Sequence, residues 1–234
     1  VRTEATGYGT VVFANEMLKT RGESMDGKRV VVSGSGNVAI YAAEKAAQLG
    51  ATVVGFSDSG GFVVDEDGID LDLLKQIKEI ERGRVSDYVD RRPSAKLGNA
   101  GGSIWDVPVD VALPCATQNE LNLDHANKLI KNGVKVVAEG ANMPTTPDAI
   151  HTFQRAGVLY APGKAANAGG VATSALEMQQ NASRDSWTFE HTEQRLRAIM
   201  GALHDNCLAT ADEYDAPGNY LVGANVAGFV QVAD

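Results

Sequence analysis

The sequence of 234 residues has the length of one or two domains and is long enough to bury a sizeable core. Its hydrophobic fraction of 44% and charged fraction of 22% are those of an ordinary globular protein. A net charge of −9 argues against nucleic acid or an anionic membrane surface as a general partner, but not against one nucleotide held in a local site. No run of about 18 apolar residues predicts a membrane span.

Cysteine usage and the start of the chain add two expectations. Cys115 and Cys207 allow at most one disulfide, and we interpret them as buried thiols in a reducing compartment, which favours the cytoplasm. No C-x-x-C or Cys/His spacing occurs, so we predict no metal ligands. Because the chain begins at Val1 inside an ongoing motif, we expect a piece of a longer protein.

The first elements in chain order form a familiar unit. A helix is expected over residues 6–20, with Thr6 as a candidate N-cap. Residues 28–33 are apolar and β-branched, which is typical of a buried parallel strand. Residues 34–39 then read G-x-G-x-x-A and run into a helical pattern, and residues 52–56 predict a second strand. The strand, loop, helix and strand have the order of a dinucleotide-binding unit.

The physical logic of this loop is specific. Gly34 permits a tight turn, Gly36 lets the backbone approach a pyrophosphate, and Ala39 lets the helix pack close to the strand. Asp58 follows the second strand, 24 residues after Gly34, where a ribose-binding acid is expected. The alternative is a merely structural turn; the complete order of elements favours the dinucleotide site.

Strands and helices alternate up to residue 161. The remaining expected strands are 109–113, 135–138 and 158–160, and the expected helices lie at 123–130 and between Thr146 and Gly157. An amphipathic helix is marked by Leu73, Leu74, Ile77 and Ile80. Residues 83–104 lack periodicity and are predicted to be a loop. The alternation predicts an α/β fold with a doubly wound, Rossmann-like parallel sheet.

From residue 167 the pattern is helical only. A long helix is expected over 187–214, with Leu196, Ile199, Met200, Leu203 and Cys207 along one face. We therefore expect a dinucleotide-binding domain with flanking helices over 1–186 and a C-terminal helical segment over 187–234.

Ligands of open α/β sheets bind outside the carboxyl ends of the strands. Four loops are expected there, at 34–39, 57–61, 115–118 and 139–142, and each carries small or hydrogen-bonding residues. Together they favour a nucleotide crevice. Polar segments also precede two helices, at 2–9 and 164–171, although each alone would be an ordinary helix start or loop.

The choice of coenzyme stays open at this level. Asp58 would bond the 2′-hydroxyl of NAD. The flanking Ser57 and Ser59, with a basic cluster at Lys78, Arg82 and Arg84, suit a 2′-phosphate. The cluster is equally well explained as a solvated helix end.

No catalytic group is evident. The four histidines lie within predicted helices and are interpreted as surface or helix-face residues: His125, His151, His191 and His204. The strand-end loops contain neither a Ser-His-Asp set nor a carboxylate pair. We predict that no catalytic residue lies in this chain.

Four segments in combination resemble hexameric glutamate dehydrogenase, and most closely its bacterial NADP-dependent branch: 2–9, 34–39, 139–142 and 165–174. The resemblance spans nearly the whole chain. It implies the coenzyme-binding portion plus C-terminal helices that would return to a missing N-terminal substrate domain, which carries the family's catalytic lysine and aspartate. It further implies reversible oxidative deamination of L-glutamate to 2-oxoglutarate and ammonia through an iminoglutarate, with hydride transfer to NADP (NAD being the less favoured coenzyme), by a homohexamer.

The resemblance assigns coenzyme contacts residue by residue. These are Thr6, Gly34, Ser35, Gly36, Asn37, Val38, Ser57, Asp58, Ser59, Lys78, Ala116, Thr117, Gln118, Asn142 and Asn167. Thr6, Asn142 and Asn167 match the nicotinamide side, residues 34–38 the pyrophosphate loop, and residues 116–118 the adenosine side.

Val171 and Ser174 match positions that meet the side-chain carboxylate of glutamate. Leucine and phenylalanine dehydrogenases would be expected to present an apolar residue at Ser174. Two rivals remain: a dehydrogenase of another amino acid, and a non-catalytic nucleotide-binding module. The hydroxyl of Ser174 argues against the first, and the polar segments at 2–9 and 167–174 argue against the second.

Overall fold

The computed structural model describes residues 3–184 and 186–233. Its strands are β1 (Arg29–Val32), β2 (Thr52–Asp58), β3 (Gly61–Asp65), β4 (Ala95–Leu97), β5 (Val111–Leu113), β6 (Val136–Ala138) and β7 (Leu159–Ala161). Its α-helices are α1 (Ala5–Lys19), α2 (Asn37–Gln48), α3 (Leu71–Lys75), α4 (Val85–Arg91), α5 (Leu123–Lys131), α6 (Pro147–Arg155), α7 (Gly163–Ala166), α8 (Gly169–Ser183), α9 (Phe189–Glu213) and α10 (Tyr220–Ala233). A π-helix (Gln76–Ile80) and a 3₁₀-helix (Ile104–Asp106) complete the described elements.

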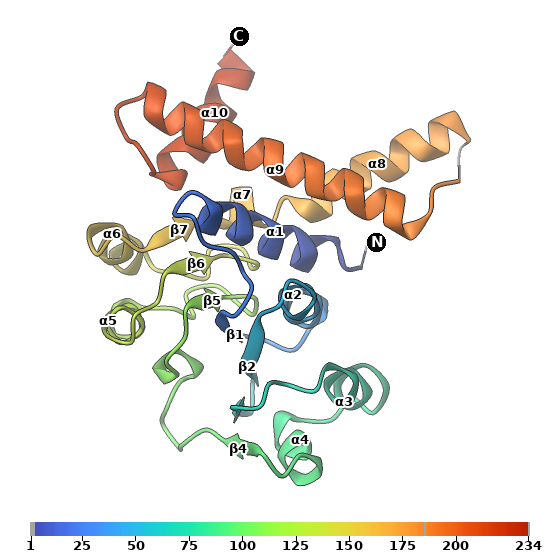
Figure 1. Ribbon diagram of the computed structural model, residues 1–234, viewed down its shortest axis with the longest axis vertical. Coiled ribbons are helices and arrows are strands. Elements are labelled where there is room, and N and C mark those ends of the chain that lie inside the picture. Colours follow the sequence, from blue (N-terminus) through green and yellow to red (C-terminus); the bar gives the residue numbers. More distant parts are fainter. Residues whose placement is uncertain (1–2, 185, 234) are drawn as a thin grey trace.

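The seven strands form one sheet in the order β4-β3-β2-β1-β5-β6-β7. Five neighbouring strands, β2, β1, β5, β6 and β7, pair in parallel. β3 and β4 add an antiparallel edge beside β2. Side chains alternate across the sheet: Val30 and Val32 pack into the core with residues of α1 and α2, whereas Val31 packs into the core with residues of α5. These helices lie on opposite faces of the sheet (Figure 1). The predicted doubly wound sheet is confirmed, and its layered arrangement buries both faces.

The strand order places a ligand crevice at one point. β1 pairs with β2 on one side and with β5 on the other. After β1 the chain continues into α2 on one face of the sheet, and after β5 it continues into α5 on the other face. This is the topological switch point, where doubly wound sheets bind their ligands.

The prediction that residues 83–104 form a loop is wrong. It contains α4 and β4, and the antiparallel strand β3 precedes them. Asp58 is the last residue of β2, and it pairs with Gly61 across a hairpin turn. α4 has seven residues and β4 has three, too few to show a hydrophobic period. Of the loop expected at 57–61, only Ser59 and Gly60 lie in the turn, because β2 extends to Asp58 and β3 begins at Gly61.

The helix predicted around residues 73–80 exists, but its apolar face is shorter than expected. α3 continues into the π-helix at Gln76, and Leu74 and Ile77 are buried while Ile80 is 70% exposed. The wider turn of a π-helix displaces Ile80 from the face that a 3.6-residue period would give it.

The helix predicted at 187–214 corresponds to α9, whose Leu196, Met200 and Cys207 are buried as expected. α9 lies across α1 and α8 and packs against α10 (Figure 1). Within residues 3–184 and 186–233 no helix is both long and apolar enough to cross a bilayer. The domain division at residue 186 stays a prediction.

Candidate functional site

Two neighbouring hollows open at the carboxyl ends of the parallel strands. The first, here called the β2 hollow, has a volume of about 530 Å³ and contains the predicted residues Gly34, Ser35, Gly36, Ser57, Asp58, Ser59 and Lys78. The second, the β6 hollow, has a volume of about 590 Å³ and contains the predicted residues Thr6, Val38, Gln118, Asn142, Asn167 and Val171. Ala116 and Thr117 line both hollows, so the loop after β5 separates them.

Two predicted residues line neither hollow. Asn37 is the exposed first residue of α2. The hydroxyl of Ser174 donates to the carbonyl of Gly170 at 3.1 Å, within its own helix α8. The fold therefore brings together every predicted site residue except these two.

The two glycines of the turn after β1 differ in what they do. Gly34 has φ +88°, and a Cβ there would lie 3.2 Å from Cα of Ala116, so the fold itself requires glycine. Gly36 has φ −87°, and a Cβ there would meet no described atom within 4 Å. The fold does not require glycine at this position. It leaves the backbone open toward the hollow, as the approach of a pyrophosphate demands.

The start of α2 lies beside this opening. Gly36 is its N-cap, and no side chain of the described residues caps the helix there. The first N–H groups of a helix have no intrahelical acceptor and carry the positive end of the macrodipole. An uncapped start next to an open backbone fits an anionic group such as a pyrophosphate.

Asp58 is turned into the protein. Its carboxylate accepts hydrogen bonds from Nζ of Lys78 (2.9 Å), the N–H of Gly60 (2.7 Å) and the N–H of Val85 (3.1 Å). Burial by itself would raise the pKa of Asp58, but the bonds from Lys78 and Gly60 outweigh it and hold the pKa below its ordinary value. An acid with three protein donors is poorly placed to serve a ribose hydroxyl.

The neighbouring Ser59 and Arg84 remain exposed at the same rim. The guanidinium of Arg84 donates to Oγ of Ser59 at 2.7 Å, and both residues line the β2 hollow. Arg84 is the N-cap of α4, which the sequence interpretation took for loop, so its position emerged only with the fold. A guanidinium beside a hydroxyl offers hydrogen-bond donors that suit the acceptor oxygens of a phosphate dianion.

The loop after β5 is held by a residue that the sequence interpretation missed. Oε1 of Glu120 accepts from the Ser33 hydroxyl (2.9 Å) and from the N–H groups of Ala116 (3.1 Å) and Thr117 (3.3 Å). Ser33 accepts in turn from the N–H of Cys115 at 2.9 Å. The sequence contains one signal for Glu120, since it is an acid that directly follows a polar loop at the end of a strand.

The loops after β6 and β7 are tied together. Glu139 accepts from the Tyr160 hydroxyl and the N–H of Gly163, each at 2.7 Å, and burial raises its pKa despite these bonds. Nδ2 of Asn167 donates to Oδ1 of Asn142 at 2.9 Å. The two predicted asparagines therefore reach the β6 hollow as a bonded pair.

The expectation that Thr6 caps α1 is wrong. The helix begins at Ala5 with Glu4 as N-cap, and Thr6 lies in its first turn. Its Oγ1 lies over Gly170, where an added Cβ would come within 2.4 Å of it. Thr6 therefore faces the β6 hollow because α1 and α8 cross closely there, and Arg2 lies outside the described residues.

The glycines of the two polar segments serve helix packing. A Cβ at Gly7 would lie 2.5 Å from the N atom of Ala42 in α2, and one at Gly9 would lie 2.9 Å from Cα of Gly169 in α8. These close crossings bring the starts of α2 and α8 to the crevice.

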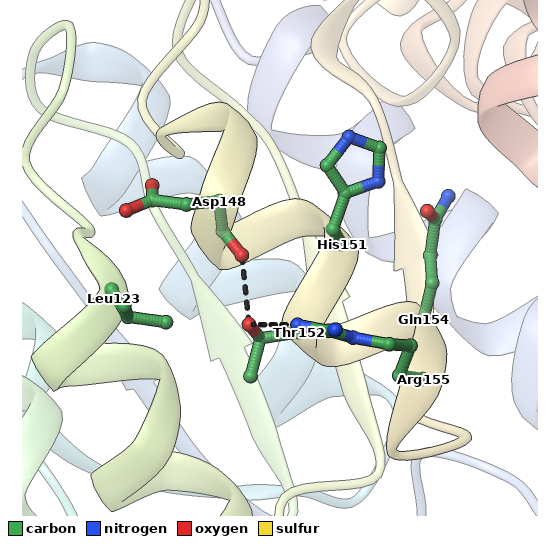
Figure 2. A pocket seen from close by; sticks show the side chains of 6 residues that line it. All are labelled: Leu123, Asp148, His151, Thr152, Gln154 and Arg155. Atoms are coloured by element: carbon green, nitrogen blue, oxygen red, sulfur yellow. Dashed lines mark hydrogen bonds between the residues drawn. The ribbon is translucent and has the colours of Figure 1, made fainter.

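A third hollow lies away from the predicted site, between α5 and α6, and Figure 2 shows its lining residues. It is lined by Leu123, Asp148, His151, Thr152, Gln154 and Arg155. The hydrogen bonds drawn there join residues of α6 to one another, such as the Thr152 hydroxyl to the Asp148 carbonyl at 2.8 Å. It contains none of the predicted site residues and we do not assign it a function.

The histidines lie on helices, as predicted, but not all are at the surface. His151 and His191 are exposed and His125 is half-buried, whereas His204 is buried beneath α10. Its Nε2 lies 3.0 Å from the Tyr220 hydroxyl and its Nδ1 lies 3.0 Å from Oδ1 of Asp205. Both cysteines are buried and unpaired thiols.

Comparison with known proteins places the chain in one family of dehydrogenases. The family model of glutamate, leucine, phenylalanine and valine dehydrogenases matches residues 1–234. The chain belongs to this family. Among its relatives, the NADP-specific glutamate dehydrogenase of Escherichia coli (strain K12) is 56% identical over 237 residues, and the NAD(P)-specific glutamate dehydrogenase of Xylanibacter ruminicola is 53% identical over 236 residues.

Solved structures of the family show the same fold. Glutamate dehydrogenase of Plasmodium falciparum matches 99% of the chain with a TM-score of 0.95 at 44% identity, and glutamate dehydrogenase 2 of the same organism matches 100% with a TM-score of 0.97 at 42% identity. Those matches cover 50% and 52% of the two solved chains. Likewise, the chain spans about half the length of the curated relatives it matches, 52% and 53% of the two named above.

Proposed function

We propose that the chain is the coenzyme-binding half of an NADP-preferring glutamate dehydrogenase, which oxidatively deaminates L-glutamate to 2-oxoglutarate and ammonia. The observation that carries the proposal is the pairing of Gly34 and Gly36. One glycine is required by the fold, and the other leaves open backbone beside an uncapped helix start. The open backbone at Gly36 serves a bound pyrophosphate, since the packing of the described residues does not require glycine there.

In this proposal each hollow holds one end of the coenzyme. The β2 hollow takes the adenosine end and the β6 hollow takes the nicotinamide end, with residues 116–118 between them. The Asn142–Asn167 pair and Thr6 orient the ring, which supplies the hydride-accepting carbon when bound. The residues of this chain bind and orient, and the groups that move protons belong to the half that the relatives possess beyond it.

The preference for NADP rests on the rim of the β2 hollow. Asp58 is engaged by Lys78 and two N–H groups, while Ser59 and Arg84 are exposed on the hollow. A 2′-phosphate would gain charge-assisted hydrogen bonds from Arg84, whereas a 2′-hydroxyl would find the carboxylate of Asp58 already engaged. The Escherichia coli relative is NADP-specific by name, which supports the same preference, whereas the Xylanibacter ruminicola relative is named NAD(P)-specific and fits either coenzyme.

We further infer that Val171 and Ser174 meet the substrate side chain, that the full protein forms a homohexamer, and that it works in the cytoplasm. Val171 is 76% exposed and lines the β6 hollow, as a substrate contact must. Ser174 lies one helical turn further along α8. Two unpaired buried thiols suit a reducing compartment. Light scattering of the full-length protein tests the hexamer.

A titration of the chain with NADPH and NADH tests the coenzyme proposal. We expect tighter binding of NADPH, and Arg84→Ala should weaken NADPH by about tenfold, the loss of one charge-assisted contact, while leaving NADH unchanged. Arg82→Ala is the matched control, since Arg82 is exposed nearby but does not line the hollow. Equal affinity for both coenzymes, or binding of neither by a folded chain, would contradict the proposal.

Substrate choice requires the full-length protein. Ser174→Ala and Ser174→Leu should raise the KM for glutamate, and Leu should admit apolar amino acids if the hydroxyl excludes them. Unchanged KM for glutamate in both variants would favour the dehydrogenase of another amino acid.

A further inference from the structure

Glu120 lies where the two loops of the topological switch point meet. It lines the β2 hollow together with Gly34, Ser35 and Gly36. Its carboxylate joins the end of β1, through the Ser33 hydroxyl, to the loop after β5, through the N–H groups of Ala116 and Thr117. Ser33 is 1% exposed and Glu120 is half-buried, whereas Ala116 and Thr117 are exposed, so the connection runs from the core to the rim of the hollow.

The bonding of this carboxylate is one-sided. The three hydrogen bonds that the described residues donate to it all end on Oε1. Three donors on one oxygen fix the loop at Ala116, and a Cβ at Gly34 would lie 3.2 Å from that residue. Removing the carboxylate would free both N–H groups and the hydroxyl at once.

A carboxylate is an unexpected group for a site that binds phosphates, because its charge repels them. Burial raises the pKa of Glu120 above its ordinary value, and the bonds from Ser33 and Ala116 only partly oppose this effect. The two negative charges of a pyrophosphate in the same hollow would raise the pKa of Glu120 further, because like charges disfavour the charged carboxylate. The repulsion is relieved if the carboxylate takes up a proton from solvent.

We propose that Glu120 is a positioning residue of the coenzyme site, which holds the β5 loop in place and couples dinucleotide binding to the uptake of one proton. The inference rests on the proposed coenzyme function and adds to it a pH-dependent residue outside the coenzyme contacts already assigned. By linkage, affinity is highest at low pH and falls as pH rises through the range between the pKa of Glu120 in the unliganded and liganded protein.

The other ionisable groups around Glu120 do not produce this dependence. Asp58 has a lowered pKa and stays charged, and Lys78 and Arg84 are cations. Burial raises the pKa of the Cys115 thiol, which stays neutral. Burial lowers the pKa of His125 and so favours its neutral ring, and any titration of this ring would persist in Glu120→Gln.

The test measures the affinity for NADH over a series from about pH 5, just above the ordinary pKa of a glutamate, to about pH 8.5. NADH is used because it lacks the 2′-phosphate, whose own ionisation lies near pH 6. We expect wild-type affinity to fall about threefold or more across this range, the effect of a fraction of one proton. Glu120→Gln keeps an acceptor oxygen without the charge, so its affinity should be independent of pH and at least equal to wild type at the upper end. Glu120→Ala loses the acceptor and should bind about tenfold more weakly at every pH.

Glu66→Gln removes a carboxylate that is 65% exposed and paired with Arg29 at the start of β1, and it should retain the wild-type slope. Circular dichroism checks that each variant is folded. A Glu120→Gln variant with the wild-type pH slope, or a folded Glu120→Ala variant with wild-type affinity, would overturn this inference and leave the proposed coenzyme function intact. Failure of the folded wild-type chain to bind any dinucleotide would overturn the coenzyme function and this inference with it.

Discussion

The carboxylate of Asp58 and the ammonium of Lys78 form a 2.9 Å ion pair whose side chains are only 6% and 12% exposed. Lys78 also donates to the carbonyl of Gly83 at 2.8 Å, so the pair connects the end of β2 to the turn before α4. The acid that would define NAD binding in a typical dinucleotide unit is thus part of the protein's internal bonding. This relationship decides which groups remain for the coenzyme.

Removing one partner of this pair should be costly. Lys78→Met leaves the Asp58 charge with two N–H donors and no cation, and we expect the free energy of unfolding to fall by about 3 kcal/mol. Combining it with Asp58→Asn should recover part of this loss, because the uncompensated charge is gone. Urea denaturation of the single and double variants measures both; equal stability of Lys78→Met and wild type would show the pair to be inert.

The same pair predicts acid sensitivity. The folded pKa of Asp58 is below its unfolded value of about 3.9, so its contribution to stability is complete well above pH 4 and is lost as pH falls through the folded pKa. The Asp58→Asn/Lys78→Met double variant should therefore lose less stability than wild type between pH 5 and 3. Thermal unfolding at stepwise lower pH provides the comparison, and identical acid profiles would contradict it.

Gly34 and Gly36 should separate folding from binding. Gly36→Ala places a methyl group in open space at φ −87°, so the chain should fold normally but bind dinucleotide at least tenfold more weakly. Gly34→Ala forces φ +88° on an L-residue and should cost about 1–2 kcal/mol of stability. Coenzyme titration beside chemical denaturation distinguishes the two; full binding by Gly36→Ala would remove the main support for a pyrophosphate site.

Two helical glycines make a matched pair for packing. A Cβ at Gly7 would lie 2.5 Å from the backbone of α2, whereas one at Gly201 in α9 would meet no described atom within 4 Å. Gly7→Ala should destabilise by about 1–3 kcal/mol through overpacking. Gly201→Ala should stabilise by about 0.5–1 kcal/mol through helix propensity. Denaturation midpoints should shift in opposite directions.

The contact of α10 with α9 contains one buried polar bond. The Tyr220 hydroxyl lies 3.0 Å from Nε2 of His204, and burial raises the pKa of this tyrosine to about 12. Tyr220→Phe leaves the histidine nitrogen without its partner and should destabilise by about 1–3 kcal/mol. Tyr214→Phe is the control, since Tyr214 is half exposed. Hydrogen exchange should show the loss concentrated in α10; uniform exchange changes would contradict this.

Local patterns were sufficient for the dinucleotide unit. The run from Val30 to Ala39 predicts a buried strand, a glycine turn and a closely packed helix, because each depends on neighbouring residues and a fixed period. The parallel strands at 111–113, 136–138 and 159–161 followed from the same alternation. These elements also predicted which four loops would meet at the crevice, since parallel strands end at one edge of the sheet.

Elements too short to show a clear hydrophobic period were not predictable in this way. The three residues of β4 and the seven of α4 gain their structure by pairing with β3 and packing on the sheet. Arg84 therefore reached the β2 hollow from a segment interpreted as loop. Thr6 likewise took its place from the close crossing of α1 and α8, which depends on Gly9 and Gly169 meeting across the fold.

What the sequence determined by itself was the class of fold and the position of the crevice at the strand ends, because both arise from period, glycine spacing and strand order. What only the tertiary structure decided was the direction of individual side chains. Asp58 could have faced the ribose, but Lys78 and the N–H of Val85 lie 20 and 27 residues away in sequence and turn it inward. Glu120 became part of the site through Ser33, which is 87 residues distant. Long-range hydrogen bonds of this kind have no local signature, since each donor is set by the packing of separate elements.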